Sequence, residues 1–175
     1  MRRLGLSIFT LLFLFGCGSN INLFSTNDFS LELSEGWIVS ENTDDMPKNT
    51  ELVIMKRDIK TAEVMSINIV SETVSDDDFV DNIYFEKTIE MMEKRENYAL
   101  ISDDSFNVGG HQAMIHEFSY NNQEEVIYVL QMYVLDQINK KGYVLTSITK
   151  DMDYKAKFSD VTKIMRSFTP NQIVE

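Results

Sequence analysis

The sequence contains few of the residues that usually carry catalytic chemistry. Its 175 residues include one cysteine, two histidines, two prolines and seven glycines. A single cysteine excludes an intramolecular disulfide and a cysteine-rich metal site. The chain also lacks a glycine-rich phosphate loop and the glycine-flanked serine of a nucleophile elbow. We therefore expect a noncatalytic domain that is held together by its apolar core, with no catalytic residue, cofactor or metal site assigned.

Positive charge is also scarce. The chain has 16 lysine and arginine residues against 28 aspartate and glutamate residues, which gives a formal net charge of −12. A surface this acidic is repelled by the phosphates of nucleic acids. Binding to DNA or RNA is therefore excluded as an expected function.

The longest hydrophobic run lies near the start of the chain, from Leu4 to Phe15, directly after Arg2 and Arg3. A membrane-spanning helix needs about 20 apolar residues, whereas a secretory signal needs a positive start and an apolar core of about 7 to 15 residues. Residues 1–16 are therefore predicted to be a signal peptide. Its removal would take away two arginines and no acid, lowering the net charge from −12 to −14, and would leave enough chain for one domain.

The sole cysteine lies at the end of this run. Leu14, Phe15, Gly16 and Cys17 resemble a bacterial lipobox, which implies cleavage between Gly16 and Cys17 and attachment of fatty acids such as palmitate at Cys17. Two or more acyl chains hold a protein stably on a membrane. The expected location is therefore the cell envelope, with the protein membrane-anchored and facing the periplasm or the cell exterior. The alternative is that Cys17 is a small buried residue in an uncleaved anchor.

The remaining chain divides into three parts. Residues 17–26 lack a clear period and are predicted to be a lipidated tether, in which the nine residues after the cysteine reach at most about 30 Å. Residues 27–170 are predicted to form a single domain, and residues 171–175 a tail.

Alternating or continuously apolar segments predict the strands of this domain. Residues 126–135 are apolar at nearly every position, so that strand should be central and buried on both faces. Tight turns are expected at Gly109 and Gly110, at Asn121 and Asn122, and in a turn that closes at Gly142. The expected strands cover residues 29–33, 51–57, 64–70, 98–108, 111–120, 126–136 and 143–150.

Two segments have helical spacing of their apolar residues. The first is residues 75–96, where Ser75 is the expected N-cap and the acids at 76–78 favour the positive end of the helix dipole. A calcium site is the alternative role for these acids, but they lack the glycine-containing loop of alternating acids that calcium sites use, so capping is the expected role. The second is residues 154–168, with Asp151 or Asp153 as the expected cap and Thr169 and Pro170 as the stop.

The order of these segments resembles the PsbP-like and DcrB-like proteins over most of residues 28–168. The resemblance is carried by FSLELSEGW, by NVGGHQAMIHEF, by VIYVLQMYV, by KGYVLTSIT and by a final helix ending in MRSF. It implies an α+β fold in which an antiparallel sheet of about six or seven strands is sandwiched by helices. Many bacterial members of that family are exported lipoproteins without known catalysis, and the family has no catalytic motif to transfer.

The histidines are the only side chains that ordinarily act as bases near neutral pH. His111 and His116 are separated by an odd number of positions on one expected strand, so they should point to opposite faces and cannot share a metal ion. We expect His111 to be a surface residue at the edge of a turn. We expect His116 to be a partly buried sheet residue that is hydrogen-bonded to a neighbour.

Three functions remain open from the sequence. The leading one is a lipid-anchored accessory or binding protein of the cell envelope that docks to another envelope protein. The alternative is a carrier of a small apolar ligand in a pocket between sheet and helices, and a hydrolase is the third. Methionine is an adaptable pocket residue, and the carrier hypothesis would use Met91, Met92, Met114 and Met132.

Overall fold

A computed structural model of the chain describes residues 21–40, 49–57, 63–79 and 83–171. The predicted signal peptide, the predicted cleavage site between Gly16 and Cys17, and the predicted lipidation of Cys17 lie outside the described residues. The same is true of the last four residues of the predicted tail.

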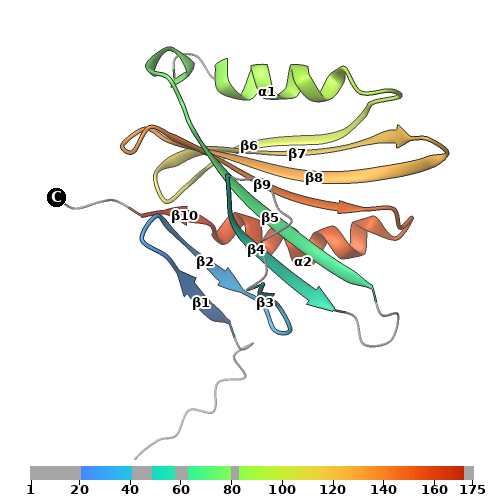
Figure 1. Cartoon of the computed structure of the whole chain (residues 1–175), viewed down its shortest axis with the longest axis horizontal. Coiled ribbons are helices and arrows are strands. Elements are labelled where there is room, and N and C mark those ends of the chain that lie inside the picture. The colour runs from blue at the N-terminus through green and yellow to red at the C-terminus, as the bar shows by residue number, and fades with distance from the viewer. Residues whose placement is uncertain (1–20, 41–48, 58–62, 80–82, 172–175) are drawn as a thin grey trace, which may run out of the picture.

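The central element of the fold is a seven-stranded, antiparallel sheet (Figure 1). Its strands lie in the order β3-β4-β5-β9-β8-β7-β6, so the last four strands of the sheet follow one another as a meander. This confirms the predicted α+β fold with an antiparallel sheet. The strands are β3 (Ile38–Val39), β4 (Thr50–Arg57), β5 (Val64–Thr73), β6 (Ala99–Val108), β7 (His111–Asn122), β8 (Glu125–Asp136) and β9 (Lys141–Thr149).

A second, three-stranded sheet contains β1 (Asn22–Ser25), β2 (Phe29–Leu33) and β10 (Thr169–Pro170), in the order β1-β2-β10. The predicted tether, residues 17–26, contains β1, which pairs with β2 along its whole length, so regular structure begins before the predicted domain start at residue 27. The reason is Phe24, which packs against the main core from this strand. Asn171, predicted to begin a loose tail, donates its backbone N–H to the carbonyl oxygen of Asp28 at 2.8 Å.

The first helical segment is shorter than predicted. A 3-10 helix covers Asp76–Phe79, and the α-helix α1 covers Ile83–Glu93. Glu90 and Lys94 form an ion pair one helical turn apart, with 3.0 Å between the carboxylate oxygen and Nζ. The buried residues of α1 are Tyr84, Phe85 and Thr88.

The second helix, α2, covers Tyr154–Ser167 and buries the predicted apolar face. Its capping differs from the prediction, because Asp153 occupies the N-cap position without a side-chain cap hydrogen bond. Asp151 instead accepts a hydrogen bond from the backbone N–H of Asp153 at 2.9 Å and forms an ion pair with Lys157 at 2.7 Å. Pro170 follows the helix as predicted, but it also belongs to β10.

The hairpin turns are partly as predicted. Gly109 and Gly110 join β6 to β7 with φ of +56° and +87°, a conformation that favours glycine. The turn predicted at Asn121 and Asn122 lies further along the chain, because β7 continues through Asn122 and the positive φ of 59° falls on Gln123. Gly142 lies inside β9, and the turn before it ends at Lys140, whose φ is +52°.

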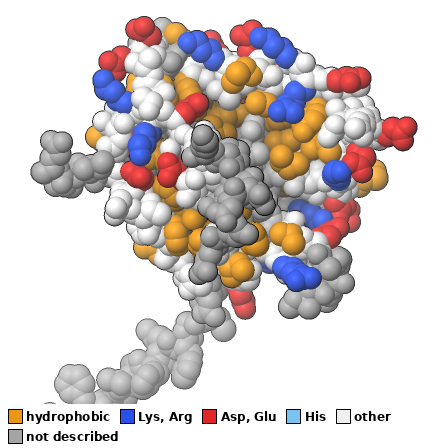
Figure 2. All heavy atoms as spheres, in the orientation of Figure 1, with side chains coloured by type: hydrophobic (Ala, Val, Ile, Leu, Met, Phe, Trp, Pro, Cys, Tyr) orange, Lys and Arg blue, Asp and Glu red, His pale blue; other side chains and the backbone are white. Residues whose placement is uncertain are grey.

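Helices cover both faces of the large sheet. One core lies between the sheet and α2, together with β2, and includes Leu31, Met132, Tyr143 and Phe168. A separate cluster, which includes Phe85, lies between the sheet and α1. In Figure 1, α1 and α2 lie on opposite sides of the strands. On the face shown in Figure 2, hydrophobic side chains remain visible among the charged ones.

The predicted burial of residues 126–135 is largely confirmed. β8 lies between β7 and β9, and from Val129 onward each of its residues is buried. Alternate side chains of β8 enter the two cores, because successive residues of a strand point to opposite faces.

Gly142 permits close contact between α1 and the sheet. A Cβ atom at this position would lie 2.6 Å from the hydroxyl oxygen of Tyr84 and 2.9 Å from Cγ2 of Val74. We expect Gly142→Ala to lower the free energy of unfolding by about 1–3 kcal/mol, the usual cost of an overpacked core. Urea denaturation should measure this loss. In a Tyr84→Ala background the same substitution should cost clearly less, and equal costs in the two backgrounds would contradict this explanation.

Candidate functional site

A row of polar side chains crosses the sheet on the face that carries α1. It runs from Asp103 on β6 to His116 on β7, Gln131 on β8 and Thr146 on β9, and each is the direct cross-strand partner of the next. The register of three adjacent hairpins therefore aligns four polar residues within a mainly apolar layer.

His116 is the central residue of this row and has no exposed surface. Its Nδ1 is hydrogen-bonded to the carboxylate of Asp103, and its Nε2 lies 2.9 Å from the hydroxyl oxygen of Tyr98. A carboxylate only accepts hydrogen bonds, so Nδ1 donates to Asp103, and in the neutral ring Nε2 then accepts from the hydroxyl of Tyr98. The rings of Tyr98 and Phe118 pack against the imidazole at centroid distances of 6.1 and 5.1 Å and against each other at 5.5 Å.

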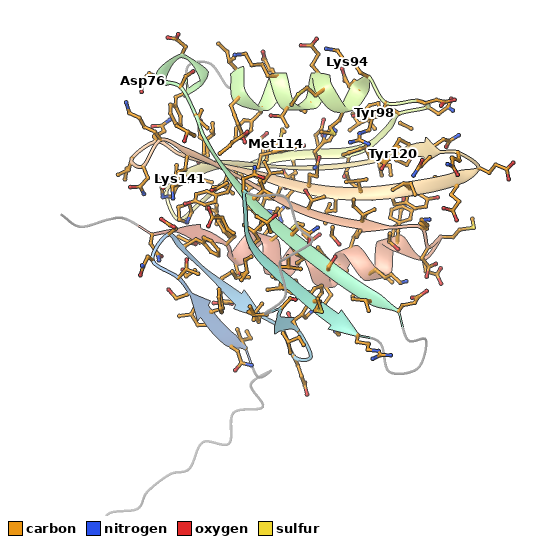
Figure 3. All side chains as sticks on the ribbon, viewed as in Figure 1. Asp76, Lys94, Tyr98, Met114, Tyr120 and Lys141 are labelled. Carbon is orange, nitrogen blue, oxygen red and sulfur yellow. The ribbon has the colours of Figure 1, made fainter. Side chains whose placement is uncertain are left out.

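Tyrosines in this layer remain protonated. Burial raises the pKa of Tyr98, and the negative charges of Glu93 and Asp103 raise it further. Burial also raises the pKa of Tyr133, whose hydroxyl donates to Oε1 of Gln131 at 2.6 Å. The amide of Gln131 donates in turn to Oγ1 of Thr146 at 3.0 Å. Figure 3 shows Tyr98 between α1 and the sheet.

This geometry favours a structural role for His116. Both ring nitrogens are engaged and the ring is enclosed, so a substrate cannot reach either nitrogen as it would a general base. The prediction that His116 is hydrogen-bonded within the sheet is confirmed, although its burial is complete rather than partial. Sequence reasoning missed its partner Asp103. Counting six residues back from Gly109 and six forward from Gly110 would have placed Asp103 opposite His116.

The prediction for His111 is wrong. This residue is 7% exposed rather than a surface residue, and its Nδ1 lies 3.8 Å from the buried carboxylate of Asp136. Asp136 also accepts two backbone hydrogen bonds of 3.1 Å, from Ile138 and Asn139, which order the turn between β8 and β9. His111 is buried because this turn packs beside the start of β7. The two histidines do point to opposite faces, as predicted.

The four methionines of the carrier hypothesis do not gather in one place. Met91 is 58% exposed, and Met132 is buried in the core on the α2 side. Met114 is buried on the α1 side, and Met92 packs against a different cluster there. The sequence could not place them, because methionine occurs on both faces of the sheet.

One groove does lie between α1 and the sheet, on the side of β6. We call it the α1–β6 groove; its volume is about 360 Å³. Phe85, Ile89 and Met114 form its apolar base, and Met114 is seen below α1 in Figure 3. Polar residues surround this base: Glu86, Ser105, Asn107 and Gln112.

A second hollow, of about 580 Å³, lies where β2, β4 and α2 approach one another. Its wall includes Asp160, whose Oδ2 accepts hydrogen bonds from Nε1 of Trp37 and from Nζ of Lys56, each at 2.9 Å. Burial alone would raise the pKa of Asp160, but these two donors outweigh it and hold the pKa below its usual value. The ionised carboxylate thus links α2 to β4 and to the segment after β2.

Within the described parts of the chain, no group of three or more His, Cys, Asp or Glu side chains is placed to hold a metal ion. None of the helices in those parts is both long enough and apolar enough to span a bilayer.

Three solved structures share this fold. LpqN from Mycobacterium tuberculosis, described as involved in cell envelope biogenesis, superposes with a TM-score of 0.63 at 13% identity, covering 82% of this chain and 83% of LpqN. CyanoP, the cyanobacterial PsbP from Synechocystis, has a TM-score of 0.58 at 14% identity, covering 90% and 99%. The Ran-binding protein Mog1p from Saccharomyces cerevisiae has a TM-score of 0.61 at 8% identity, covering 87% and 96%.

These similarities establish a PsbP-like α+β fold, and none of the three descriptions names a catalytic activity. No protein-family model and no curated protein sequence matches the chain.

The hydrogen bond from Tyr98 to His116 can be tested by removing one oxygen atom. We expect Tyr98→Phe to lower the free energy of unfolding by about 1–3 kcal/mol, because it leaves Nε2 of a buried histidine without its donor. Tyr120→Phe is the matched control, since Tyr120 packs in the same cluster and among the described residues its hydroxyl has no hydrogen-bond partner. Equal losses in the two variants, measured by chemical denaturation, would contradict the assigned bond.

The lowered pKa of Asp160 predicts a dependence of stability on pH. A group whose pKa is lower in the folded state stabilises the protein above its unfolded pKa, here 3.8, and loses that contribution as the pH falls through the folded value. Asp160→Asn should therefore be less stable than the wild type at pH 7, and the difference should shrink below about pH 4. Fluorescence of Trp37, the sole tryptophan, during urea unfolding measures it. A difference that is constant between pH 7 and 3 would contradict the ion-pair role.

Proposed function

We propose that this chain is a lipoprotein acylated at Cys17, and that its domain is a noncatalytic accessory protein that docks to another protein of the cell envelope. The observation that carries the proposal is the position of the only cysteine, which directly follows an apolar run of signal-peptide length and Gly16. Few other reasons would place a lone cysteine at the border between an apolar and a polar segment.

The start of the folded domain is consistent with an anchor at this position. β1 begins at Asn22, only five residues after Cys17. Five residues span at most about 17 Å when fully extended. A domain attached in this way would work close to the bilayer surface. The side chains of Ile21 and Leu23, next to the proposed anchor, are 55% and 72% exposed.

The side-chain chemistry supports a binding role over catalysis. His116 has both ring nitrogens engaged in a closed layer, and His111 is buried beside Asp136. Raised pKa values keep Tyr98 and Tyr133 protonated, which makes both poor nucleophiles. These features disfavour the hydrolase hypothesis.

The comparisons add support from proteins of the same fold. LpqN is described as involved in cell envelope biogenesis, which agrees with an envelope location for this chain. Mog1p is described as Ran-binding, an example in which this fold binds another protein. The carrier hypothesis keeps one supporting feature, the apolar base of the α1–β6 groove, but that groove contains only Met114 among the four methionines considered.

Acylation of Cys17 is tested by metabolic labelling with an alkyne analogue of palmitate. The wild-type chain should be labelled and should sediment with membranes. Cys17→Ser should lose the label and remain as the uncleaved precursor, because the peptidase acts on the acylated cysteine.

A matched control moves the thiol by two positions in the double variant Cys17→Ser, Ser19→Cys. This chain keeps one cysteine, but no longer directly after Gly16, so we expect no label. Label on the control, or unchanged processing and sedimentation of Cys17→Ser, would overturn the proposed anchor.

A further inference from the structure

The longest open edge of the large sheet is β6. The sheet ends at β3 on one side and at β6 on the other, and β3 has two residues while β6 has ten. β6 pairs with β7 alone, and among the described residues its backbone makes no hydrogen bond outside that ladder. An edge with unpaired N–H and C=O groups can accept a further strand.

The regular part of this edge is Ser102–Val108. The β6–β7 register shifts between Leu100 and Ser102, and from Ser102 to Val108 each residue has a partner on β7. Seven residues of antiparallel strand extend about 24 Å, enough to pair with a short peptide segment. The bulge limits the docking edge at its start, and the Gly109–Gly110 turn limits it at its end.

The α1–β6 groove runs beside this same part of the edge. Asp103 turns toward His116 on the α1 face, so alternation places Ser105 and Asn107 on that face as well. Both are short side chains, which leaves the space below α1 unfilled. A strand added to β6 would place alternate side chains over Phe85, Ile89 and Met114.

The charges around the edge favour a basic occupant. Asp103, 42% exposed, and Glu86 lie on the groove side of the edge, whereas Asp104 on the opposite face already pairs with Arg166; the chain carries a net charge of −12. Pairing of β6 with a second copy would bring the Asp103 and Glu86 carboxylates of both copies to one edge, which like-charge repulsion opposes. Lysine or arginine on the added segment would meet these carboxylates instead.

We infer that β6 and the α1–β6 groove bind an extended segment of a partner protein by strand addition, with apolar side chains alternating with Lys or Arg. Backbone hydrogen bonds from Ser102–Val108 hold the segment, its apolar side chains enter the groove, and its basic side chains meet the acids of β6 and Glu86. This inference rests on the proposed docking function and names the chemistry of the partner.

The test uses the full chain as cells accumulate it, in mild detergent, with a capped peptide of about nine residues in which valine alternates with lysine. NMR should show shifts of the amides of residues 102–108 and of the Met114 methyl group. A peptide with glutamate in place of lysine should not bind, and N-methylation of its central residues, which removes their hydrogen-bond donors, should abolish binding. Shifts confined to other surfaces, or no binding at millimolar peptide, would overturn the inference.

Ser105→Trp should fill the groove and weaken peptide binding by about tenfold or more, as expected when a central contact is blocked. The matched variant is Ser159→Trp, at an exposed serine of α2, the helix on the opposite side of the sheet from α1. Ser159→Trp should bind the peptide as the wild type does. Both serines are exposed, so matching thermal unfolding of the two variants shows that the fold is intact. Equal binding by both variants and the wild type would overturn the groove assignment.

The two proposals fail in different ways. If the peptide binds at β6 but the chain carries no acyl group, the docking inference holds and the proposed anchor is wrong. If the chain is acylated but does not bind the peptide, the proposed anchor holds and the docking inference is wrong.

Discussion

The burial of β8 on both of its faces is the constraint on which the rest of the structure depends. A strand that places apolar side chains on both sides of a sheet requires a covering layer on each side. Here α2 and β2 provide one layer and α1 provides the other. The two layers come from distant parts of the chain, and the small sheet closes the α2 side because β10, directly after α2, pairs with β2.

The same register that aligns the apolar layers also aligns the polar ones. Once β6, β7, β8 and β9 pair as consecutive hairpins, Asp103, His116, Gln131 and Thr146 must lie side by side. A buried polar group is costly without a partner, so the row is tolerated because each member is hydrogen-bonded. The polar row therefore favours this register over alternative registers. A slip of β6 by one residue would place Asp103 on the other face of the sheet, away from His116.

Most of the large sheet could be predicted from the sequence, because alternation and turn residues are local signals. The Gly109–Gly110 turn is the clearest example, since both residues adopt the positive φ that favours glycine. β1 and β10 could not be predicted in the same way. They have four and two residues, and their pairing with β2 depends on contacts that are remote in sequence.

The candidate site was less accessible to sequence reasoning than the fold. His116 was singled out correctly as a bonded sheet residue, but the burial of His111 depends on the carboxylate of Asp136, which belongs to another strand. The hydrogen bonds from Trp37 and Lys56 to Asp160 join three segments that no local pattern connects. The short-range periodicity of the sequence predicts on which face of the sheet a side chain lies. Predicting its partner on the next strand also requires the register between the two strands.

The unpaired edge has a consequence for how such a domain avoids self-association. An open edge strand can pair with the edge strand of another molecule, so a strand of ten residues such as β6 needs features that prevent this pairing. β6 has two such devices, the bulge after Leu100 and the adjacent carboxylates of Asp103 and Asp104. Arg166 of α2 pairs with Asp104 and lies over Phe106 at 4.3 Å, which holds the far side of the strand against the core. The protection is therefore selective by charge, because it repels another acidic edge while leaving the backbone of Ser102–Val108 open to a basic one.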